Sequence, residues 1–338
     1  MIDETTLSEL EIAQYGNCRL CPRNCGVNRL TGERGFCGMG PLPMVARAAL
    51  HYWEEPCISG REGSGAVFFS GCNLRCVFCQ NREISRGRAG KEINAGRLAE
   101  IFLELQQQGA NNINLVTAVM FIPTVAGALL RAKEQGLRIP VVYNCGGYEE
   151  PEALKLLDGL VDIYLPDFKY MEPETAKNYS EAGDYAVKAK AAVSEMVRQV
   201  GEPAFDSRGM MEKGVMVRHL LLPGKRKEAE RIIAYLYGTY GERIYFSIMN
   251  QYTPMKPSAK ALQPGESKRE NKAENKAEMK ELYRRVTSYE YDKTIEYALS
   301  LGITRGYMQE GKTAKESFIP AFDLEGVEKR ADRTAEPE

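Results

Sequence analysis

The chain has 338 residues, of which 43% are hydrophobic and 27% charged, and its 45 basic and 46 acidic residues give a formal net charge of -1. This balance argues against a nucleic acid or a membrane surface as the partner, and the sequence shows no basic patch interleaved with aromatic residues. The first ten residues are acidic and lack the features of a signal peptide, and no apolar run reaches the length of a bilayer crossing. We therefore expect a cytoplasmic protein whose nine cysteines serve as metal or redox ligands rather than as disulfides.

A first group of cysteines lies near the N-terminus among many turn-forming residues, at Cys18, Cys21, Cys25 and Cys37. Four thiolates make a complete ligand set, which suits either a closed structural zinc site or an auxiliary iron-sulfur cluster. The spacing does not separate these two alternatives. Either centre would staple a segment that has few apolar residues, so we assign residues 1–60 to a small cysteine-rich extension.

The second group of cysteines, Cys72, Cys76 and Cys79, has the spacing C-x3-C-x2-C and directly follows an apolar run at 66–69 that is typical of a buried strand. Three thiolates are one short of the four that close a 4Fe-4S cluster, so one iron would stay open. Zinc motifs usually add a second pair of Cys or His, but His51 and His219 are far apart in the sequence. The pattern therefore favours an iron-sulfur cluster.

This motif, with an aromatic residue just before its third cysteine, resembles the signature of the radical S-adenosylmethionine (SAM) superfamily. The resemblance implies that the amino and carboxylate groups of SAM chelate the open iron, and that an electron from the cluster cleaves SAM to a 5'-deoxyadenosyl radical. The block 54–60 and the run FFSGCNLRCVFCQN are similar to the PflX-type subgroup, which is associated with pyruvate formate-lyase activation. Within that run, the resemblance implies Phe78 and Asn81 as cofactor-binding residues.

From Ala66 onward, apolar runs alternate with amphipathic helical segments, which predicts a parallel sheet with right-handed crossovers. We expect strands at 66–70, 113–116, 139–143, 161–165, 215–222 and 244–249. Periodicity does not say whether the sheet closes. The resemblance implies an α/β fold, an incomplete (β/α)6 radical SAM barrel over residues 61–255 with the cluster at its C-terminal mouth.

Polar residues just past the strand ends are candidates for binding the cofactor, because the C-terminal ends of parallel strands meet at one mouth. Thr117 follows the second strand, where the superfamily commonly carries a Gly-Gly-Glu segment that this chain lacks. Asn144 follows the third strand, in a stretch that resembles an element of the activating enzymes. Asp167 and Lys169 follow the fourth strand, where a carboxylate and an ammonium group would complement the zwitterionic end of SAM.

The fifth strand supplies the last candidate for cofactor binding, His219, next to Arg218. Neighbours on a strand point to opposite faces, so we expect one of the two, and not both, to face the mouth. The sequence singles out no catalytic side chain beyond these cofactor ligands.

The chain changes character after the barrel segment. Residues 256–281 are a run of mixed charges without apolar periodicity, which we interpret as an exposed insertion or, in its second half, a solvated helix. Residues 282–325 are predicted to hold one more helix and a closing segment. Residues 326–338 are charged and predicted to be a disordered tail.

Together these patterns predict a radical SAM oxidoreductase that takes electrons from a low-potential donor of the flavodoxin or ferredoxin type. By resemblance, its substrate would be a glycine Cα-H in a partner glycyl radical enzyme. A second hypothesis directs the same chemistry at a peptide or small molecule and gives the N-terminal cysteines an auxiliary cluster. A third is a metal-stapled binding protein without catalysis, whose function would survive the loss of Cys72, Cys76 and Cys79.

Overall fold

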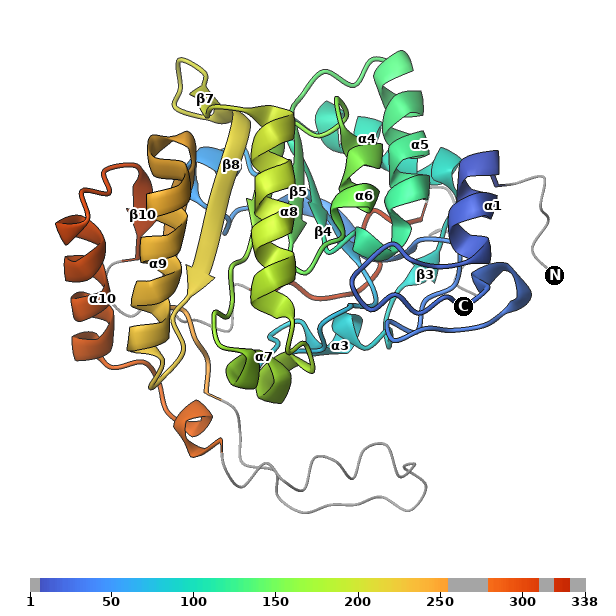
Figure 1. Ribbon diagram of the computed structural model, residues 1–338. Coiled ribbons are helices and arrows are strands. Elements are labelled where there is room, and N and C mark those ends of the chain that lie inside the picture. Colours follow the sequence, from blue (N-terminus) through green and yellow to red (C-terminus); the bar gives the residue numbers. More distant parts are fainter. Residues whose placement is uncertain (1–6, 255–278, 310–318, 329–338) are drawn as a thin grey trace, which may run out of the picture.

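The computed structural model describes residues 7–254, 279–309 and 319–328. Its frame is a parallel β-sheet whose strands alternate with helices (Figure 1). The order β2-β4-β5-β6-β8-β9-β10 places successive strands side by side, as short crossover connections require. These parallel strands are β2 (Ser64–Phe69), β4 (Ile113–Val116), β5 (Val141–Cys145), β6 (Ile163–Pro166), β8 (Met211–Leu220), β9 (Tyr245–Met249) and β10 (Gly306–Met308).

Every strand predicted from the sequence is present, with ends shifted by a few residues. The strand predicted from 139 begins instead at Val141, because Pro140 has no N-H to donate to a ladder. The prediction of a mixed α/β fold with a parallel sheet is confirmed. The path of the sheet ends at β10 and at β3 (Lys91–Glu92), so within the described residues it stays open, as in a partial barrel.

Four strands were not predicted: β10 at one edge of the sheet, the short β7 (Ala204–Phe205) that pairs antiparallel with β8, and two further elements at the other edge. The strand β1 (Met44–His51) pairs antiparallel with β2, and β3 pairs antiparallel with β1. A register shift between Val45 and Arg47 breaks the period-2 pattern by which a strand is recognised. This strand lies within the segment assigned to the N-terminal extension, and it belongs to the sheet.

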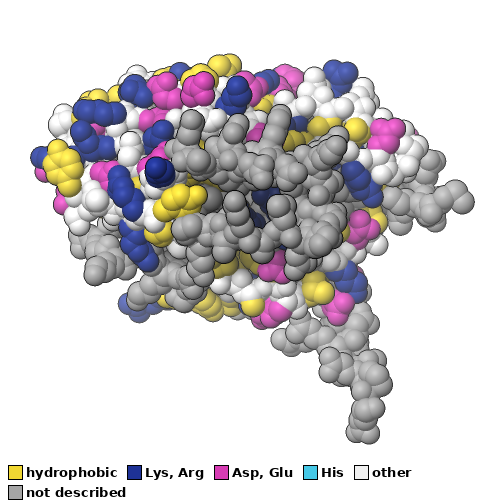
Figure 2. Space-filling model, turned by 90° about the horizontal axis from the view of Figure 1, so that it is seen from below, with side chains coloured by type: hydrophobic (Ala, Val, Ile, Leu, Met, Phe, Trp, Pro, Cys, Tyr) yellow, Lys and Arg dark blue, Asp and Glu magenta, His cyan; other side chains and the backbone are white. Residues whose placement is uncertain are grey.

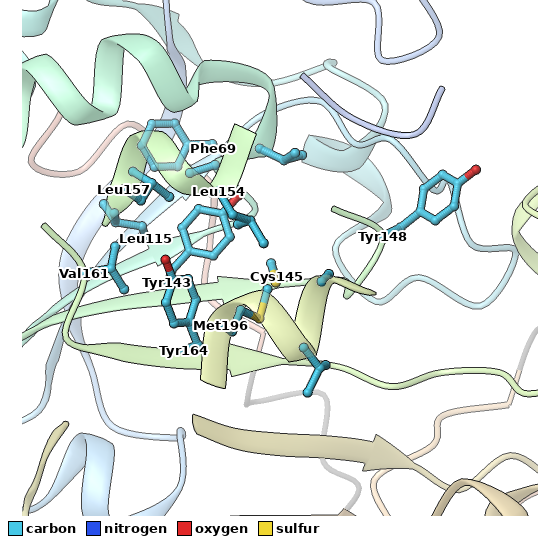
Figure 3. Close-up of a cluster of buried hydrophobic side chains, with 14 of the residues drawn as sticks. Phe69, Leu115, Tyr143, Cys145, Tyr148, Leu154, Leu157, Val161, Tyr164 and Met196 are labelled. Carbon is cyan, nitrogen blue, oxygen red and sulfur yellow. The ribbon is translucent and has the colours of Figure 1, made fainter. Parts of the chain in front are cut away.

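The longer helices between the strands pack along one face of the sheet, where Figure 1 shows α5, α8 and α9, together with the short α6, in front of the strands. Side chains on this helix side form the largest core, and Figure 3 shows Tyr143, Cys145, Tyr164 and Met196 close together within it. The helices are α1 (Glu9–Gly16), α2 (Pro56–Ser59), α3 (Arg82–Ser85), α4 (Ala95–Gln107), α5 (Ile122–Glu134), α6 (Pro151–Leu154), α7 (Pro173–Ser180), α8 (Tyr185–Val200), α9 (Arg226–Tyr240) and α10 (Ser288–Ser300).

The opposite, inner face of the sheet has an apolar layer and, nearer the C-terminal strand ends, a polar layer. The apolar layer contains Cys57 and Ile58 of α2 with Val142 and Ile163 from the first residues of β5 and β6 and Met216 from the middle of β8. In each strand, the residue two positions closer to the C-terminus lies on the same face as the apolar residue. The fold therefore places polar groups next to the apolar layer, toward the C-terminal strand ends.

Among the described residues, no helix is long and apolar enough to cross a membrane. The predicted charged insertion lies, apart from its last residues, outside the described residues, and so does the predicted tail from residue 329.

Candidate active site

Arg218 is the centre of a network of charged and amide side chains on the inner face. Its Nε donates to Asp167 Oδ1 at 2.9 Å, its Nη1 to Glu54 Oε2 at 3.2 Å and its Nη2 to Asn144 Oδ1 at 2.6 Å. Asp167 also accepts from Lys169 Nζ at 2.5 Å. Strand ends at β5, β6 and β8 thus bring together residues that are far apart in the sequence.

Neighbouring opposite charges keep the side chains of this network ionised although burial opposes it. Burial alone would raise the pKa of Asp167, but Arg218 and then Lys169 outweigh it and hold that pKa below its ordinary value. Burial would lower the pKa of Lys169, but the Asp167 carboxylate raises it. The side chains of Asp167 and Lys169 remain 17% and 18% exposed, so a ligand can reach them.

Two buried acceptor atoms beside the network lack a partner among the described residues: Asn114 Oδ1 and Glu55 Oε2. Asn114 is fully buried on β4, and its amide nitrogen donates to Glu54 Oε1 at 3.1 Å. An unpaired buried acceptor costs about 1–3 kcal/mol unless a donor reaches it. An ammonium or hydroxyl group of a ligand would supply such a donor.

The three cysteines of the C-x3-C-x2-C motif lie on the loop after β2, between that strand and α3. Ser180 Oγ donates to Cys76 Sγ at 3.0 Å, and Leu74 N donates to Cys72 Sγ at 3.4 Å. Burial, and then the charges of Cys76 and Cys79, raise the pKa of Cys72 to about 12. Cys76 is buried, and Cys72 and Cys79 are partly exposed. The thiolate of Cys72 therefore needs a compensating cation such as iron.

Lys169 connects the network to the cysteine loop. The charge of Cys76 acts on the pKa of Lys169, and the ammonium group of Lys169 acts in turn on that of Cys79. The ammonium group of Lys169 has three N-H donors, and one of them donates to Asp167. A cation with donors to spare thus stands between the cysteines and the polar network.

Thr117, the site residue predicted after β4, has a strained backbone. Its φ is +61°, a left-handed conformation that β-branched residues rarely adopt. Its N-H donates to the carbonyl of Asn144 at 2.8 Å, which fixes the turn at the strand end. Strain of this kind concentrates at functional sites, which supports the prediction without testing it.

The remaining predicted cofactor residues have other surroundings. Phe78 packs edge-on against the rings of Tyr170, Tyr179 and Tyr252, and Asn81 precedes the first turn of α3. His219 is buried with its Nδ1 2.7 Å from the carbonyl oxygen of Phe168. Arg218 and not His219 joins the inner network, so the roles of Phe78, Asn81 and His219 stay predictions.

Sequence reasoning missed the contribution of Glu54 and Glu55. Both residues belong to the block that resembles the PflX-type subgroup. They come directly before α2, whereas the candidates were sought just past the ends of the parallel strands. The sequence did offer one signal, a pair of carboxylates next to the apolar stretch Cys57-Ile58. A carboxylate that is buried beside such a stretch needs a cation or a hydrogen-bond donor as its partner.

The N-terminal cysteines form a second group of thiols. Cys18, Cys21, Cys25 and Cys37 line one cavity, and no disulfide joins them. Burial raises the pKa of Cys21 to about 12, and the charges of Cys37 and Cys18 add to that shift. Within the described ranges, no three Cys, His, Asp or Glu side chains converge closely enough to hold a single metal ion.

The mouth lies at the lower end of Figure 1, toward which β8 points and where α3 and α7 lie. Figure 2 shows this end from below, with Lys and Arg side chains interspersed among Asp and Glu on the described part of the face.

Comparison with known proteins gives three findings. The family model described as Radical SAM superfamily matches residues 66–236. An uncharacterized protein of Methanocaldococcus jannaschii is 28% identical over 301 residues, which cover 86% of this chain and 77% of that protein. The pyruvate formate-lyase-activating enzyme of Clostridium pasteurianum is 27% identical over 174 residues, which cover 49% of this chain and 65% of that enzyme.

Among solved structures, the crystal structure of a radical SAM methyltransferase from Sphaerobacter thermophilus resembles this chain with a TM-score of 0.44 and 13% sequence identity. The likeness covers 73% of this chain and 66% of that one.

Proposed function

We propose a hydrogen-abstracting function for this chain, which belongs to the radical SAM superfamily. Membership implies an enzyme that binds a 4Fe-4S cluster and SAM. When bound, these groups supply a one-electron reductive cleavage of SAM to methionine and a 5'-deoxyadenosyl radical, which takes hydrogen from a substrate. The observation that carries the proposal is the cysteine loop at the mouth of the sheet beside a network suited to a zwitterion.

The donor set fits both groups. Cys72, Cys76 and Cys79 would hold three irons of the cluster and leave one open. Lys169, with donors to spare beside the cysteine loop, would bind the carboxylate of SAM. The unpaired Asn114 Oδ1, near the strained Thr117, would accept from the ammonium group.

Arg218 acts as a positioning residue. It fixes Asp167, Glu54 and Asn144 through separate hydrogen bonds, so these side chains are held before a ligand arrives. Preorganised groups of this kind lower the cost of ordering the site on binding.

For the substrate, we favour a glycine Cα-H of a glycyl radical enzyme, as in the PflX-type subgroup that the sequence resembles. The similarity to the activating enzyme of Clostridium pasteurianum supports this choice. The open edge of the sheet also supports it, because a polypeptide loop can enter a barrel that does not close.

A second candidate substrate is the side chain of another peptide. A cavity of about 160 Å³ lies beside β1, lined by Arg47, His51, Trp53, Phe68 and others. Arg47 pairs with Phe68 across the strands, so both side chains lie on the same face of the sheet. The cavity is smaller than an ordinary small-molecule pocket and suits one side chain.

The test is anaerobic reconstitution with iron and sulfide, followed by a reductant-dependent assay for 5'-deoxyadenosine. We expect the wild type to form it and Cys76→Ala to lose it, because the cluster would lose a ligand. The matched control is Cys145→Ala, since this buried cysteine lies in the helix-side core. Zinc in place of iron at the three cysteines, or no deoxynucleoside from reduced wild type, would refute the proposal.

A second arm of the test addresses the substrate. The reconstituted enzyme is mixed with SAM, reductant and a candidate glycyl radical enzyme, and electron spin resonance is recorded. A new doublet on the partner supports the glycyl target. Cleavage of SAM that depends on a peptide, without that doublet, supports the second candidate.

A further inference from the structure

We propose that Cys18, Cys21, Cys25 and Cys37 bind a second 4Fe-4S cluster, ligated at all four corners, which passes single electrons to the cluster at Cys72, Cys76 and Cys79. The relay role rests on the proposed function, whereas the presence of the second cluster does not.

The backbone around the N-terminal thiols is folded tightly enough to hold a cluster. Cys18 and Val27 are joined by a hydrogen bond of 3.0 Å, and Gly26 N donates to the carbonyl of Cys18 at 2.9 Å. Phe36 N points at Cys25 Sγ at 3.4 Å, the same kind of N-H to sulfur contact that Leu74 makes with Cys72. A Cβ on Gly35 would lie 2.8 Å from Cys25 Sγ, so this position needs glycine.

Arg29 is the independent observation that points to an anion at this place. Its side chain lines the same cavity, is only 1% exposed, and has a nitrogen, Nε, without a hydrogen-bond partner in the described part of the chain. Its other nitrogens donate to the carbonyls of Met120 and Gly40, and Nη1 lies 3.9 Å from Cys18 Sγ. Its guanidinium lies 4.5 Å from the centre of the Tyr15 ring and 5.5 Å from that of the Phe121 ring. Among the described residues it forms no ion pair with a carboxylate, so only aromatic faces and carbonyl oxygens face its charge.

A metal centre with four thiolates would balance this cation, because both zinc and a 4Fe-4S core carry less positive charge than four thiolates carry negative charge. Zinc has no redox chemistry, whereas a 4Fe-4S cluster carries single electrons. The direct packing between this cysteine loop and that of Cys72, Cys76 and Cys79 therefore favours the iron-sulfur centre.

Phe36 connects the two groups. The guanidinium of Arg23 lies 3.8 Å from the centre of the Phe36 ring and that of Arg75 lies 4.5 Å from it. Arg23 Nε also donates to the carbonyl of Asn73 at 2.7 Å, and Arg75 donates to the carbonyl of Phe36. Phe36 is next to Cys37, while Asn73 and Arg75 lie between Cys72 and Cys76. Packed side chains therefore run without a gap from one cysteine loop to the other.

The relay is a balanced one-electron step. A reduced electron-transfer protein of the flavodoxin or ferredoxin type gives one electron to the N-terminal cluster and is itself oxidised. The N-terminal cluster returns to its oxidised state when that electron passes to the cluster at Cys72, Cys76 and Cys79. No bond forms or breaks, and no proton needs to move.

The presence of the second cluster is tested by iron content. After anaerobic reconstitution with iron, sulfide and zinc available, we expect about eight irons per chain in the wild type and about four in the triple variant Cys72→Ala, Cys76→Ala, Cys79→Ala. The reduced triple variant should show the spin resonance of a 4Fe-4S cluster. One zinc per chain with about four irons in the wild type, or a triple variant without iron, would overturn the proposal. These readouts do not need SAM cleavage, so they can succeed where the proposed function fails.

Arg29→Met sharpens the assignment without removing a ligand. A nearby cation stabilises the more negative, reduced cluster, so its loss should move the reduction potential of the N-terminal cluster to a more negative value. The same variant placed in the triple-variant background isolates this signal. An unchanged potential would overturn the role given to Arg29 as counter-charge.

The relay is tested by the ratio of two rates of SAM cleavage, one driven by a reduced flavodoxin and one by dithionite. In the double variant Cys18→Ala, Cys21→Ala we expect this ratio to fall at least about tenfold, because the protein donor loses its point of entry. If the double variant does not fold, Phe36→Ala, which interrupts the connection, takes its place with the same expectation. An unchanged ratio overturns the relay, and absence of cleavage by the dithionite-reduced wild type overturns the proposed function instead.

Discussion

Near the C-terminal strand ends, a carboxyl group on the inner face and one on the helix side have pKa values shifted in opposite directions. On the inner face, Asp167 is held ionised because Arg218 and Lys169 lower its pKa by more than burial raises it. On the helix side, Glu149 is 1% exposed, accepts a hydrogen bond from Tyr143 at 3.2 Å, and burial raises its pKa to about 7. Asp167 keeps 17% of its side chain exposed and Glu149 1%, but burial opposes ionisation of both, and only Asp167 has cationic partners that outweigh it.

This difference in pKa places the ionised side chains on the inner face, where a ligand can bind them. A fixed set of ionised groups beside the cysteine loop can bind a zwitterion, whereas the Glu149 carboxyl group, which keeps its proton up to about pH 7, lies beside the core residues Tyr143, Tyr164 and Cys145. Figure 3 shows these three side chains together in that core. Substitution of charged residues on each face tests whether the two faces differ in this way.

The largest effect is expected for Arg218→Met. Removing this guanidinium leaves Glu54 and Asp167 buried with fewer partners, which should lower the free energy of unfolding by about 3–5 kcal/mol. Chemical denaturation of the reconstituted protein, followed by circular dichroism without oxygen, measures it. SAM affinity should fall in the same variant.

The neighbouring residue provides the control for that variant. His219→Gln should cost about 1 kcal/mol, because it alters one hydrogen bond to the carbonyl of Phe168 on the helix side. Similar losses of stability and SAM affinity in both variants would show that the two faces do not differ as described.

The next effect is a dependence of stability on pH. Glu149 has a pKa of about 7 in the folded protein against an ordinary value of 4.5, so the folded state holds its proton more tightly. Stability from this group is complete below about pH 4.5, is lost as the pH rises toward 7, and amounts to about 3 kcal/mol. Thermal unfolding between pH 5 and 8 should show this loss.

Glu149→Gln keeps the shape and removes the titration, so its unfolding should depend less on pH and exceed the wild type in stability at pH 8. The exposed Glu152→Gln is the matched control and should keep the wild-type slope. Equal slopes for all three proteins would mean that Glu149 is not buried as a neutral acid.

The sequence predicted the strands because they follow from local periodicity, and it named candidate residues just past their ends, of which Asn144, Asp167 and Lys169 belong to the network around Arg218. Asp167 and Lys169 lie two residues apart on one strand end, and alternation alone put them on the same side. The sequence did not predict that Arg218 would bind Asp167, Glu54 and Asn144, because these contacts join four separate segments. Nor could it choose between Arg218 and His219, since alternation separates their faces without saying which face is inner.

A smaller effect is expected for Lys169→Met. The variant removes the donor that we propose for the carboxylate of SAM, and a charge-assisted hydrogen bond of this kind is worth about 1.5–3 kcal/mol, or about tenfold to a hundredfold in the dissociation constant. Binding of SAM to the anaerobically reconstituted protein measures it. The exposed Lys155→Met is the control, since Lys155 pairs with the exposed Glu152 and not with the inner network. An unchanged affinity in Lys169→Met would place the carboxylate of SAM elsewhere.

The smallest effect concerns the strain at Thr117. A left-handed backbone costs a β-branched residue about 1–2 kcal/mol, and asparagine tolerates it better while retaining an oxygen acceptor. Thr117→Asn should therefore raise the free energy of unfolding by up to about 1 kcal/mol, while the displaced oxygen weakens SAM binding a few-fold. Glu181→Asn relieves similar strain at the end of α7, where φ is +53°, and should stabilise the protein without changing SAM affinity. If Thr117→Asn also stabilises without changing SAM affinity, the strain serves only the turn, and the inner face loses one of its proposed contacts with the ligand.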